Sequence, residues 1–416
     1  MSSIRIAIVG AGPVGLLLAR LLLDNPGVDV IVFESDQSPS VRRQGGSLDL
    51  HPTTGIAALK EAGLYEEFLK RVRFDGEALI ICDKNLIPYV NLPRAEENTS
   101  RGRPEIDRSS LREMLLHSVP PGMIRWGWRL CSIDFQHRLV FDQGTESGFD
   151  LVVGADGAWS KTRQLLSSQT PIYSGIAGIS FTIPDAEERA PKGYEMVNRG
   201  SVFAYSDGKG ITAQQAGDGS LDISAWYVQR EDWREHAAHD ISTAQGARTE
   251  VVENYQDWDS RLIDFVHQGE RPVARSLYML PVGWKWKHRP GVTLIGDAAH
   301  VMTPFAGEGV NLGMQDALLL SRAILKASKS SDPTSQLPGQ IKTFEADLFV
   351  RARKTAELTR DMMQWWFFTD GSPRSVVEKV VIRITTFHQS GPLAYATFPF
   401  FAAGVYAYYF GFKWFH

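Results

Sequence analysis

The stretch IRIAIVGAGPVG, residues Ile4 to Gly15, decides how this chain folds. Its first six residues are almost all apolar and predict a buried strand, and the apolar run that follows predicts a helix. Gly10 allows a tight turn out of the strand, Gly12 lets the backbone approach a pyrophosphate, and Gly15 lets the helix pack against the sheet. The helix N-terminus offers free N–H groups and a partial positive charge to phosphates. The stretch therefore predicts the start of a dinucleotide-binding fold.

A second predicted strand, residues 28–33, ends in an acid that completes this motif. Glu34 follows Gly15 by 19 residues, where a carboxylate accepts hydrogen bonds from an adenosine ribose and repels a 2′-phosphate. Strand, helix and acid together make a bound nucleotide a strong prediction. The motif alone does not distinguish NAD from FAD.

Two later segments repeat the design of a strand followed by a turn of small residues. The first is DLVVGADGAWSKTR, residues 150–163, in which Ser160 lies near a predicted helix cap. The second, VTLIGDAAH at 292–300, continues through PFAGEGVN at 304–311 into a long helix with one apolar face. Asp297 at the strand end suits a polyol hydroxyl such as those of flavin ribitol, and the glycines let the backbone approach a flat ring. The helix N-terminus would stabilise negative charge on a reduced flavin.

In this order along the chain, the three motifs resemble those of the class A, or single-component, FAD-dependent monooxygenases. Within that family the chain is similar to the tetracycline-inactivating flavin monooxygenases. The similarity covers residues 1–360. The further segments that carry it are GGSLDLH at 45–51, EIDRSSLR at 105–112, Asp232-Trp233 and DWD at 257–259.

The resemblance implies cofactor-binding residues beyond the glycine motif. Arg42 lies where the family has an arginine near the flavin or the incoming nicotinamide, and Arg43 beside it is a second candidate. Without the resemblance, Arg108 would be interpreted as a surface charge on a helix. The other implied positions are Asp49, Arg108, Asp156, Gly157, Gly296, Asp297, Gly309, Val310 and Asn311.

No catalytic side chain is implied, because the flavin itself carries the chemistry. We expect Pro304, Gly307 and Gly309 to shape the loop beside it, and His300 to have a structural role in the preceding turn. The histidines and cysteines show no metal-ligand spacing, so we expect no metal site.

The implied fold class is α/β: a Rossmann-like, three-layer FAD-binding domain of the glutathione-reductase type, an inserted antiparallel sheet and C-terminal helices. Residues 1–170 and 289–345 would form the discontinuous FAD domain, with 71–100 on the substrate side. Short apolar alternations in 171–288 predict the antiparallel substrate-binding sheet, and 346–416 a helical segment with an aromatic tail. Residues there that are candidates for either a pocket or plain sheet packing are Met196, Tyr205, Gln214, Gln215, Trp226 and Tyr227.

The resemblance implies an oxidoreductase that uses FAD, NADPH or NADH as transient co-substrate, and O2. It would insert one oxygen atom into a polycyclic, phenolic or apolar small molecule, by hydroxylation or epoxidation through a flavin 4a-hydroperoxide. Such reactions belong to secondary metabolism or to tetracycline-type antibiotic resistance. No second complete GxGxxG motif is present, so the nicotinamide would use a shared surface. A flavin-dependent reductase or oxidase on the same fold, and a non-catalytic flavoprotein, remain alternatives.

The composition argues against a nucleic-acid partner and favours a reducing cellular compartment. The formal net charge of −4 over 416 residues gives no basic excess for a nucleic-acid surface. Two cysteines in a chain of this size are typical of a reducing compartment, so we expect a cytoplasmic protein, with a monomer plausible.

The C-terminal tail has an unusual composition. No Lys, Arg, Asp or Glu occurs between Arg383 and Lys413, and residues 391–412 are crowded with Phe, Tyr and Ala. We expect Pro392 and Pro399 to interrupt this segment. A helix packed on the domain and a contact with a membrane surface are both consistent with it.

Overall fold

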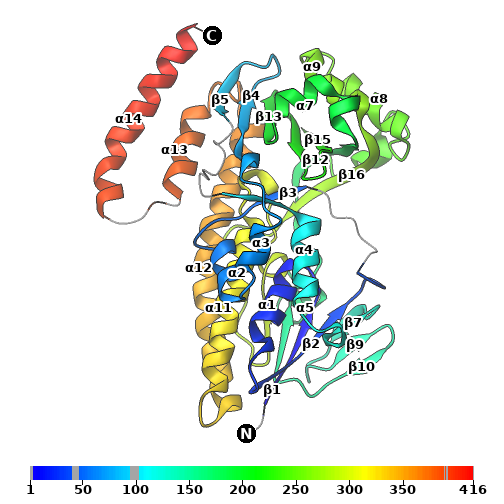
Figure 1. Ribbon diagram of the computed structural model, residues 1–416, viewed down its shortest axis with the longest axis vertical. Coiled ribbons are helices and arrows are strands. Elements are labelled where there is room, and N and C mark those ends of the chain that lie inside the picture. Colours follow the sequence, from blue (N-terminus) through cyan, green and yellow to red (C-terminus); the bar gives the residue numbers. More distant parts are fainter. Residues whose placement is uncertain (1–2, 40–45, 94–102, 388, 390–391, 416) are drawn as a thin grey trace. The chain divides into compact units, whose positions relative to one another are not determined.

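The computed structural model describes residues 3–39, 46–93, 103–387, 389 and 392–415. It divides into two compact units, each built from three stretches of sequence (Figure 1). Unit 1 comprises residues 1–72, 102–172 and 278–357, and unit 2 comprises residues 73–101, 173–277 and 358–416.

The central feature of unit 1 is a parallel five-stranded sheet in the order β17-β11-β1-β2-β7. Strand β1 is buried along almost its whole length, as its apolar sequence predicts for a strand covered on both faces. Two smaller sheets, β10-β9-β8 and β3-β6, complete the unit. The strands are β1 Ile4–Val9, β2 Val28–Glu34, β3 Ser47–Asp49, β6 Glu105–Asp107, β7 Ile124–Trp126, β8 Leu130–Ile133, β9 Leu139–Phe141, β10 Gly144–Glu146, β11 Leu151–Gly154 and β17 Val292–Leu294.

Helices α1 and α11 pack against each other beside this sheet. Gly313 of α11 permits the close approach, because a Cβ atom there would lie 2.7 Å from the side chain of Val14 in α1. The helices of unit 1 are α1 Pro13–Leu23, α2 Gly55–Glu61, α3 Tyr65–Leu69, α4 Arg108–His117, η2 Pro121–Met123, α5 Lys161–Leu166, α10 Asp297–His300, η4 Pro304–Ala306 and α11 Gly309–Ser328. Helix α12, Pro333–Phe367, continues across the boundary between the units at residue 357.

Unit 2 is built on a seven-stranded sheet in the order β16-β12-β15-β14-β13-β4-β5. The pairs β12–β15, β15–β14, β14–β13 and β4–β5 are antiparallel, and β13 pairs with β4 in parallel. The α/β fold class with an antiparallel sheet and C-terminal helices is therefore confirmed. The strands are β4 Leu79–Cys82, β5 Pro88–Leu92, β12 Ile172–Ile183, β13 Ser201–Ser206, β14 Lys209–Gln215, β15 Leu221–Val228 and β16 Glu270–Met279; the helices are η1 Asp75–Glu77, α6 Ala186–Arg189, α7 Pro191–Val197, η3 Trp233–His236, α8 Ala244–Asn254, α9 Ser260–Gln268, α13 Val377–Phe387 and α14 Pro392–Phe415.

Helix α14 packs against β5 and α13, and Lys413 Nζ lies 2.6 Å from Glu378 Oε1 of α13. Val405, Tyr409 and Phe412 pack near Tyr89 of β5, and the Tyr409 hydroxyl donates a 2.8 Å hydrogen bond to the Tyr89 carbonyl. The expectation that the prolines interrupt the segment is wrong for this structure. Pro392 begins the helix, a position where its fixed φ is suitable, and Pro399 lies inside one continuous helix.

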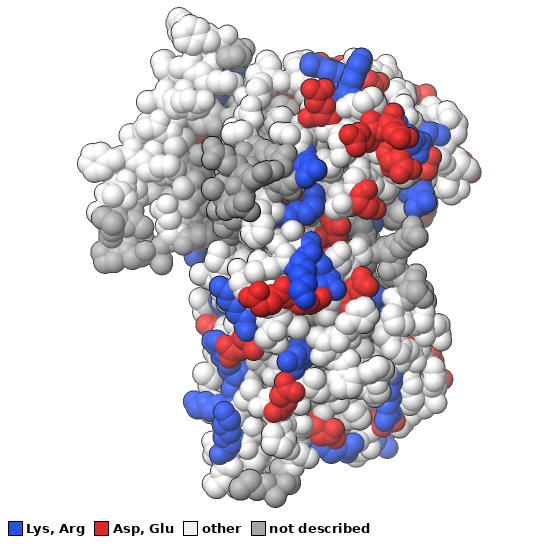
Figure 2. Space-filling view, viewed as in Figure 1, with Lys and Arg blue, Asp and Glu red and all other residues white. Residues whose placement is uncertain are grey.

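Most of the other side chains described in α14 are apolar and exposed. Its exposed aromatic side chains are Phe398, Phe400, Tyr406, Tyr408, Phe410, Trp414 and Phe415. The space-filling view shows this region, at the upper left, with very few charged atoms (Figure 2). Among the described residues, no helix has the length and apolarity needed to cross a membrane.

Candidate functional site

Three neighbouring strands of unit 1 end at one edge of the parallel sheet, and a sequence motif follows each of them. Val9 at the end of β1 pairs with Gly154 at the end of β11, which pairs in turn with the end of β17. Parallel strands point the same way, so the three turns lie side by side. We call them the glycine turn (Gly10–Gly15), the DG turn (Asp156–Gly157) and the GD turn (Gly296–Asp297).

Two glycines of the glycine turn are required by the fold itself. Gly10 has φ +107°, and a Cβ atom on it would lie 2.4 Å from the Ala155 carbonyl oxygen. A Cβ atom on Gly15 would lie 2.1 Å from the Gly10 carbonyl oxygen. Both separations are impossible for real atoms, so strand β11 and helix α1 reach their positions only with glycine here.

Gly12 and Gly309 have no such requirement within the described chain. A Cβ atom on either would meet no atom within 4 Å beyond the immediate neighbours in sequence, and Gly12 has an ordinary φ of −75°. Gly157 also borders open space, although its φ of +76° favours glycine by itself. Open cradles of this kind, at the N-termini of α1 and α11, fit a dinucleotide whose phosphates and ring approach the backbone.

Glu34 joins the end of β2 to the glycine turn. Its buried carboxylate accepts hydrogen bonds from the backbone N–H groups of Ala11 (2.7 Å) and Asp36 (2.9 Å) and from the Ser35 hydroxyl (3.0 Å). A carboxylate has about four acceptor sites, so one remains for a ribose hydroxyl. The carboxylate thus shapes the turn as well as facing the predicted ligand position.

Arg112 supports the same turn, although it was not among the residues predicted from the sequence to form the site. This buried side chain donates to the carbonyls of Ala11 (3.4 Å) and Pro39 (3.0 Å) and lies 3.6 Å from the Asp36 carboxylate. The only sequence signal was its place at the end of the EIDRSSLR segment.

The carboxylate of Asp156 in the DG turn is occupied by its own helix. It accepts hydrogen bonds from the Ser160 hydroxyl (2.6 Å), the Lys161 N–H (2.8 Å), and the N–H and hydroxyl of Thr162 (3.1 and 3.2 Å). These four bonds cap the N-terminus of α5. Any cofactor contact of this turn is therefore expected from the Gly157 backbone rather than from the Asp156 carboxylate.

Asp297 in the GD turn is in the opposite situation. Its side chain is exposed, although the two residues before it and the three after it are buried. Its carboxylate has no hydrogen bond or ion pair with any described residue. Gly296 beneath it has φ +60° and packs against Val14 of α1. A free acceptor at the edge of the sheet fits the hydroxyls of a flavin ribitol.

A buried charge network connects the GD turn to helices α11 and α12. Asp316 of α11 accepts hydrogen bonds from the Gly296 N–H (3.1 Å), His300 Nε2 (2.5 Å) and Arg351 Nη1 (2.8 Å). Burial by itself raises the pKa of Asp316, but His300 and Arg351 outweigh burial and hold that pKa below its usual range. The expected structural role of His300 corresponds to this contact; Asp316 and Arg351 were missed because the network joins residues far apart in sequence.

The loop between η4 and α11 is joined to β3 by one amide. Asn311 is fully buried; its Nδ2 donates to the Asp49 carbonyl (2.8 Å), and its Oδ1 accepts from the His51 N–H (2.9 Å) and the Thr54 hydroxyl (3.2 Å). The Asn311 side chain therefore makes its hydrogen bonds to other parts of the protein rather than to the predicted cofactor position. In the same loop, Pro304 begins η4, Gly307 has φ +69°, and Val310 is half-buried in the first turn of α11.

Asp49 and Glu308 flank the buried side chain of His51. His51 Nε2 lies 3.0 Å from Asp49 Oδ2, and His51 Nδ1 lies 3.4 Å from Glu308 Oε2. Arg103 Nη1 lies 3.7 Å from the same oxygen of Asp49. Burial lowers the pKa of His51, but the two carboxylates more than offset it and raise the pKa to about 9.

Of the two arginines predicted to contact the cofactor, the structure describes only Arg108. Arg108 is exposed at the start of α4; its N–H donates to the Gly46 carbonyl (3.1 Å), and its Nε lies 3.7 Å from a Cβ position on Gly46. Arg108 is therefore next to β3 and Asp49. Arg42, like Arg43, lies outside the described residues.

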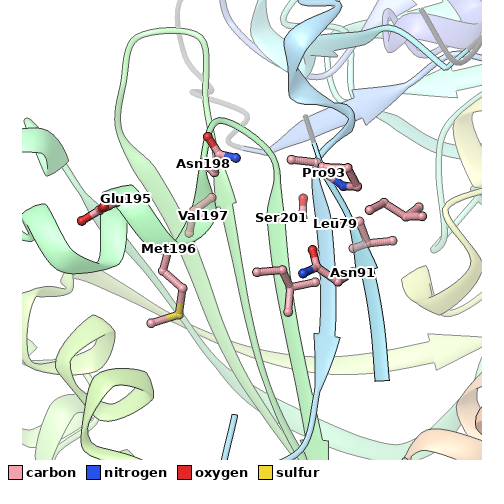
Figure 3. Close-up of a pocket in the computed structure, with 11 residues that line it drawn as sticks. Leu79, Asn91, Pro93, Glu195, Met196, Val197, Asn198 and Ser201 are labelled. Carbon is pink, nitrogen blue, oxygen red and sulfur yellow. The ribbon is translucent and has the colours of Figure 1, made fainter. Parts of the chain in front are cut away.

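Unit 2 contains a pocket of about 240 Å³ beside strands β4 and β5. Met196 and Val197 of α7 lie on one side of it, and Leu79 and Asn91 lie on the other (Figure 3). Met196 is thus the predicted candidate that lines this pocket. Tyr205, Trp226 and Tyr227 are buried in the sheet; Gln214 and Gln215 make hydrogen bonds to Ser201 and Arg199.

Comparison with known proteins identifies the family. The model of the FAD binding domain matches residues 3–98 and 142–337. Monooxygenase penA of Penicillium thymicola is 32% identical over 417 residues, which cover 86% of this chain and 94% of that protein.

Solved structures share the fold at lower sequence identity. Klebsiella pneumoniae HpxO, complexed with FAD and uric acid, has a TM-score of 0.70 at 17% identity, covering 97% of this chain and 96% of that one. Tetracycline destructase Tet(51) has a TM-score of 0.64 at 18% identity, covering 94% and 99%. From the family match, with the three motifs gathered at one sheet edge, the chain is an oxidoreductase of the class A FAD-dependent monooxygenase family.

Proposed function

We propose that this enzyme uses FAD, NAD(P)H and O2 to insert one oxygen atom into a polycyclic, phenolic or apolar small molecule of secondary metabolism. The observation that carries the proposal is Asp297, an exposed carboxylate with no hydrogen bond or ion pair to any described residue, at the edge where Gly12 and Gly309 leave open space. When bound, FAD supplies the redox and oxygen chemistry.

The residues of the chain would hold the cofactor in a defined order along this edge. The Gly12 backbone and the N-terminus of α1 would bind the pyrophosphate, and Glu34 the adenosine ribose. Asp297 would bind the ribitol. The Gly309 backbone at the start of α11 would face the ring, where the helix N-terminus favours negative charge.

We infer the reaction and the substrate class from a curated relative and from the pocket in unit 2. The curated relative with 32% identity is named a monooxygenase, which favours oxygen insertion over the reductase and oxidase alternatives. The pocket in unit 2 is lined mainly by apolar residues, among them Leu79, Leu92 and Met196. Its polar lining residues are Asn91, Glu195, Asn198 and Ser201. We propose that it receives an apolar portion of the substrate, since its volume suits a ring rather than a whole polycycle.

The test begins with the visible spectrum of the purified protein. NADPH and NADH consumption in air is then measured with and without a panel of phenolic polycycles that includes tetracycline. Flavin bands, substrate-stimulated consumption and a product heavier by one oxygen atom would support the proposal. Bound flavin with consumption but no oxygenated product from any compound would favour the oxidase or reductase, and failure to bind flavin after reconstitution would contradict the site.

A peripheral contact of α14 with a membrane surface is the second proposal. Its exposed Trp, Tyr and Phe side chains are the types that favour the membrane–water interface. Wild-type protein is expected to float with phospholipid vesicles, and the variant Phe410→Ser/Trp414→Ser to remain in solution. Phe135→Ser is the matched control, because Phe135 is equally exposed but lies in unit 1. Equal behaviour of all three proteins would contradict the proposal.

A further inference from the structure

His51 is buried between two carboxylates that come from different elements. Only 4% of its side chain is exposed. Nε2 faces Asp49 at the end of β3, at 3.0 Å, and Nδ1 faces Glu308, at 3.4 Å. A neutral imidazole has one nitrogen that only accepts hydrogen bonds, and that nitrogen would face a carboxylate oxygen. Only the protonated ring presents an N–H to both partners.

Glu308 stands between the two glycines of the flavin-facing loop. It precedes α11 immediately, and its side chain is 7% exposed. A carboxylate this deeply buried is costly without a cation nearby. His51 Nδ1 lies 3.4 Å from this carboxylate, and Arg103 Nη1 lies 3.7 Å from that of Asp49.

The contact complements the one made by Asn311. Asn311 fixes the backbone of residues 49–51 to the first turn of α11. The His51 ring adds a link from the same segment to the loop itself. Among the described residues, the carboxylates of Asp49 from β3 and Glu308 from the loop face the ring, and Arg103 contacts Asp49.

We propose that His51 is a positioning residue that, as an imidazolium, fixes the Gly307–Gly309 loop against β3 and keeps the charge beside the flavin ring from becoming more negative. The inference rests on the proposed FAD site and adds a residue outside the predicted cofactor set. Loss of the proton would leave two carboxylates at the loop, which disfavours the negative charge of a reduced ring. The raised pKa of His51 agrees with this geometry.

The primary test is FAD affinity as a function of pH in reconstituted apoprotein. In wild-type protein, the dissociation constant is expected to rise about tenfold or more as the pH passes about 9, since tenfold corresponds to one pKa unit of linkage. His51→Gln is expected to bind FAD about tenfold more weakly at pH 7, to lack the alkaline step and to lower the potential of the bound flavin. His236→Gln, an exposed histidine in unit 2, is the matched control.

Two further variants keep the proposal falsifiable if His51→Gln folds poorly. Glu308→Gln removes one carboxylate, so the alkaline step is expected to move to lower pH while the loop keeps its length. His51→Gln/Glu308→Gln removes the uncompensated charge and should recover most of the lost affinity. Identical pH profiles in wild type and in either single variant would overturn the inference while the FAD site stands, whereas failure of wild-type protein to bind FAD would overturn both.

Discussion

The DG turn and the GD turn share a design and differ in what their aspartates do. Each follows a buried parallel strand and opens a short helix at the same sheet edge. The carboxylate of Asp156 accepts four hydrogen bonds from its own helix, whereas that of Asp297 accepts none from the described residues. An acid at a strand end is thus a ligand candidate only where the following helix leaves its oxygens free.

The two turns also differ in how they are supported. The DG turn is closed by local hydrogen bonds, between residues four to six positions apart. The GD turn depends on Asp316, which comes from α11 and is neutralised in part by Arg351 of α12. We therefore expect the DG turn to keep its conformation when residues outside it are substituted. The GD turn is expected to be destabilised by substitutions in α11 or α12.

The largest effect is expected from Asp316→Asn, which breaks the support of the GD turn. The change leaves Arg351 and His300 without their buried anion, and we expect a loss of about 3–5 kcal/mol in the free energy of unfolding, measured by urea denaturation. Because the pKa of Asp316 is lowered by folding, its contribution is complete above about pH 4 and declines as the pH falls through the lower folded-state value. Arg322→Gln, which breaks the exposed pair with Glu61, should cost less than about 1 kcal/mol. Equal losses in both variants would contradict the proposed support.

The next effect concerns Asp297→Ala, which should separate binding from folding. We expect FAD to bind at least about tenfold more weakly, a loss of about 1.4 kcal/mol. The apoprotein should unfold within about 0.5 kcal/mol of wild type, because the side chain is exposed and unpaired. Fluorescence titration with FAD and urea denaturation measure the two quantities. Unchanged affinity would remove Asp297 from the site.

Asp156→Ala should show the reverse pattern. Loss of the α5 cap is expected to reduce the free energy of unfolding by about 1 kcal/mol. FAD affinity should fall less than in Asp297→Ala, because the carboxylate is already occupied. Release of FAD without any loss of apoprotein stability would make Asp156 a ligand and end the contrast between the two turns.

The smallest change in stability is expected from Gly309→Ala. A methyl group meets open space in the first turn of α11, and alanine favours helix over glycine by up to about 1 kcal/mol. The apoprotein should therefore be as stable as wild type or slightly more so, while FAD affinity falls because the methyl group occupies the cradle. Gly157→Ala is the comparison, since the φ of +76° should make that change destabilising. Unchanged FAD affinity in Gly309→Ala would contradict the proposal that FAD occupies the open space at Gly309.

Much of the fold was predictable because its signals are local. An apolar strand, a glycine turn and an acid at the end of the next strand predict the β1-α1-β2 unit, and the order of the three motifs predicts the family. The division into units was harder to predict. Residues 358–416 belong with the antiparallel sheet, as do residues 73–101, which were expected on the substrate side, and α12 crosses the boundary as one continuous helix.

The described residues of the predicted site, which exclude Arg42, lie in unit 1, but their separate roles could not be predicted from the sequence. Gly10 and Gly12 look equivalent in the motif; only the position of Ala155 shows that one is needed for packing and the other is not. Asn311 was predicted as a flavin contact, yet its amide is used to join segments some 260 positions apart in sequence.

By itself, the sequence determined the α/β class, the three turns at the ends of parallel strands and the family, because strand burial, glycine spacing and acids at strand ends are short-range patterns. Only the tertiary structure decided which carboxylates are already bound by hydrogen bonds or ion pairs within the protein. Hydrogen bonds and charge pairs among Asp316, His300 and Arg351, or Asp49, His51 and Glu308, depend on distances that close only when remote elements pack together. The partner of a buried charge is therefore a property of the fold and cannot be obtained from the pattern of one segment.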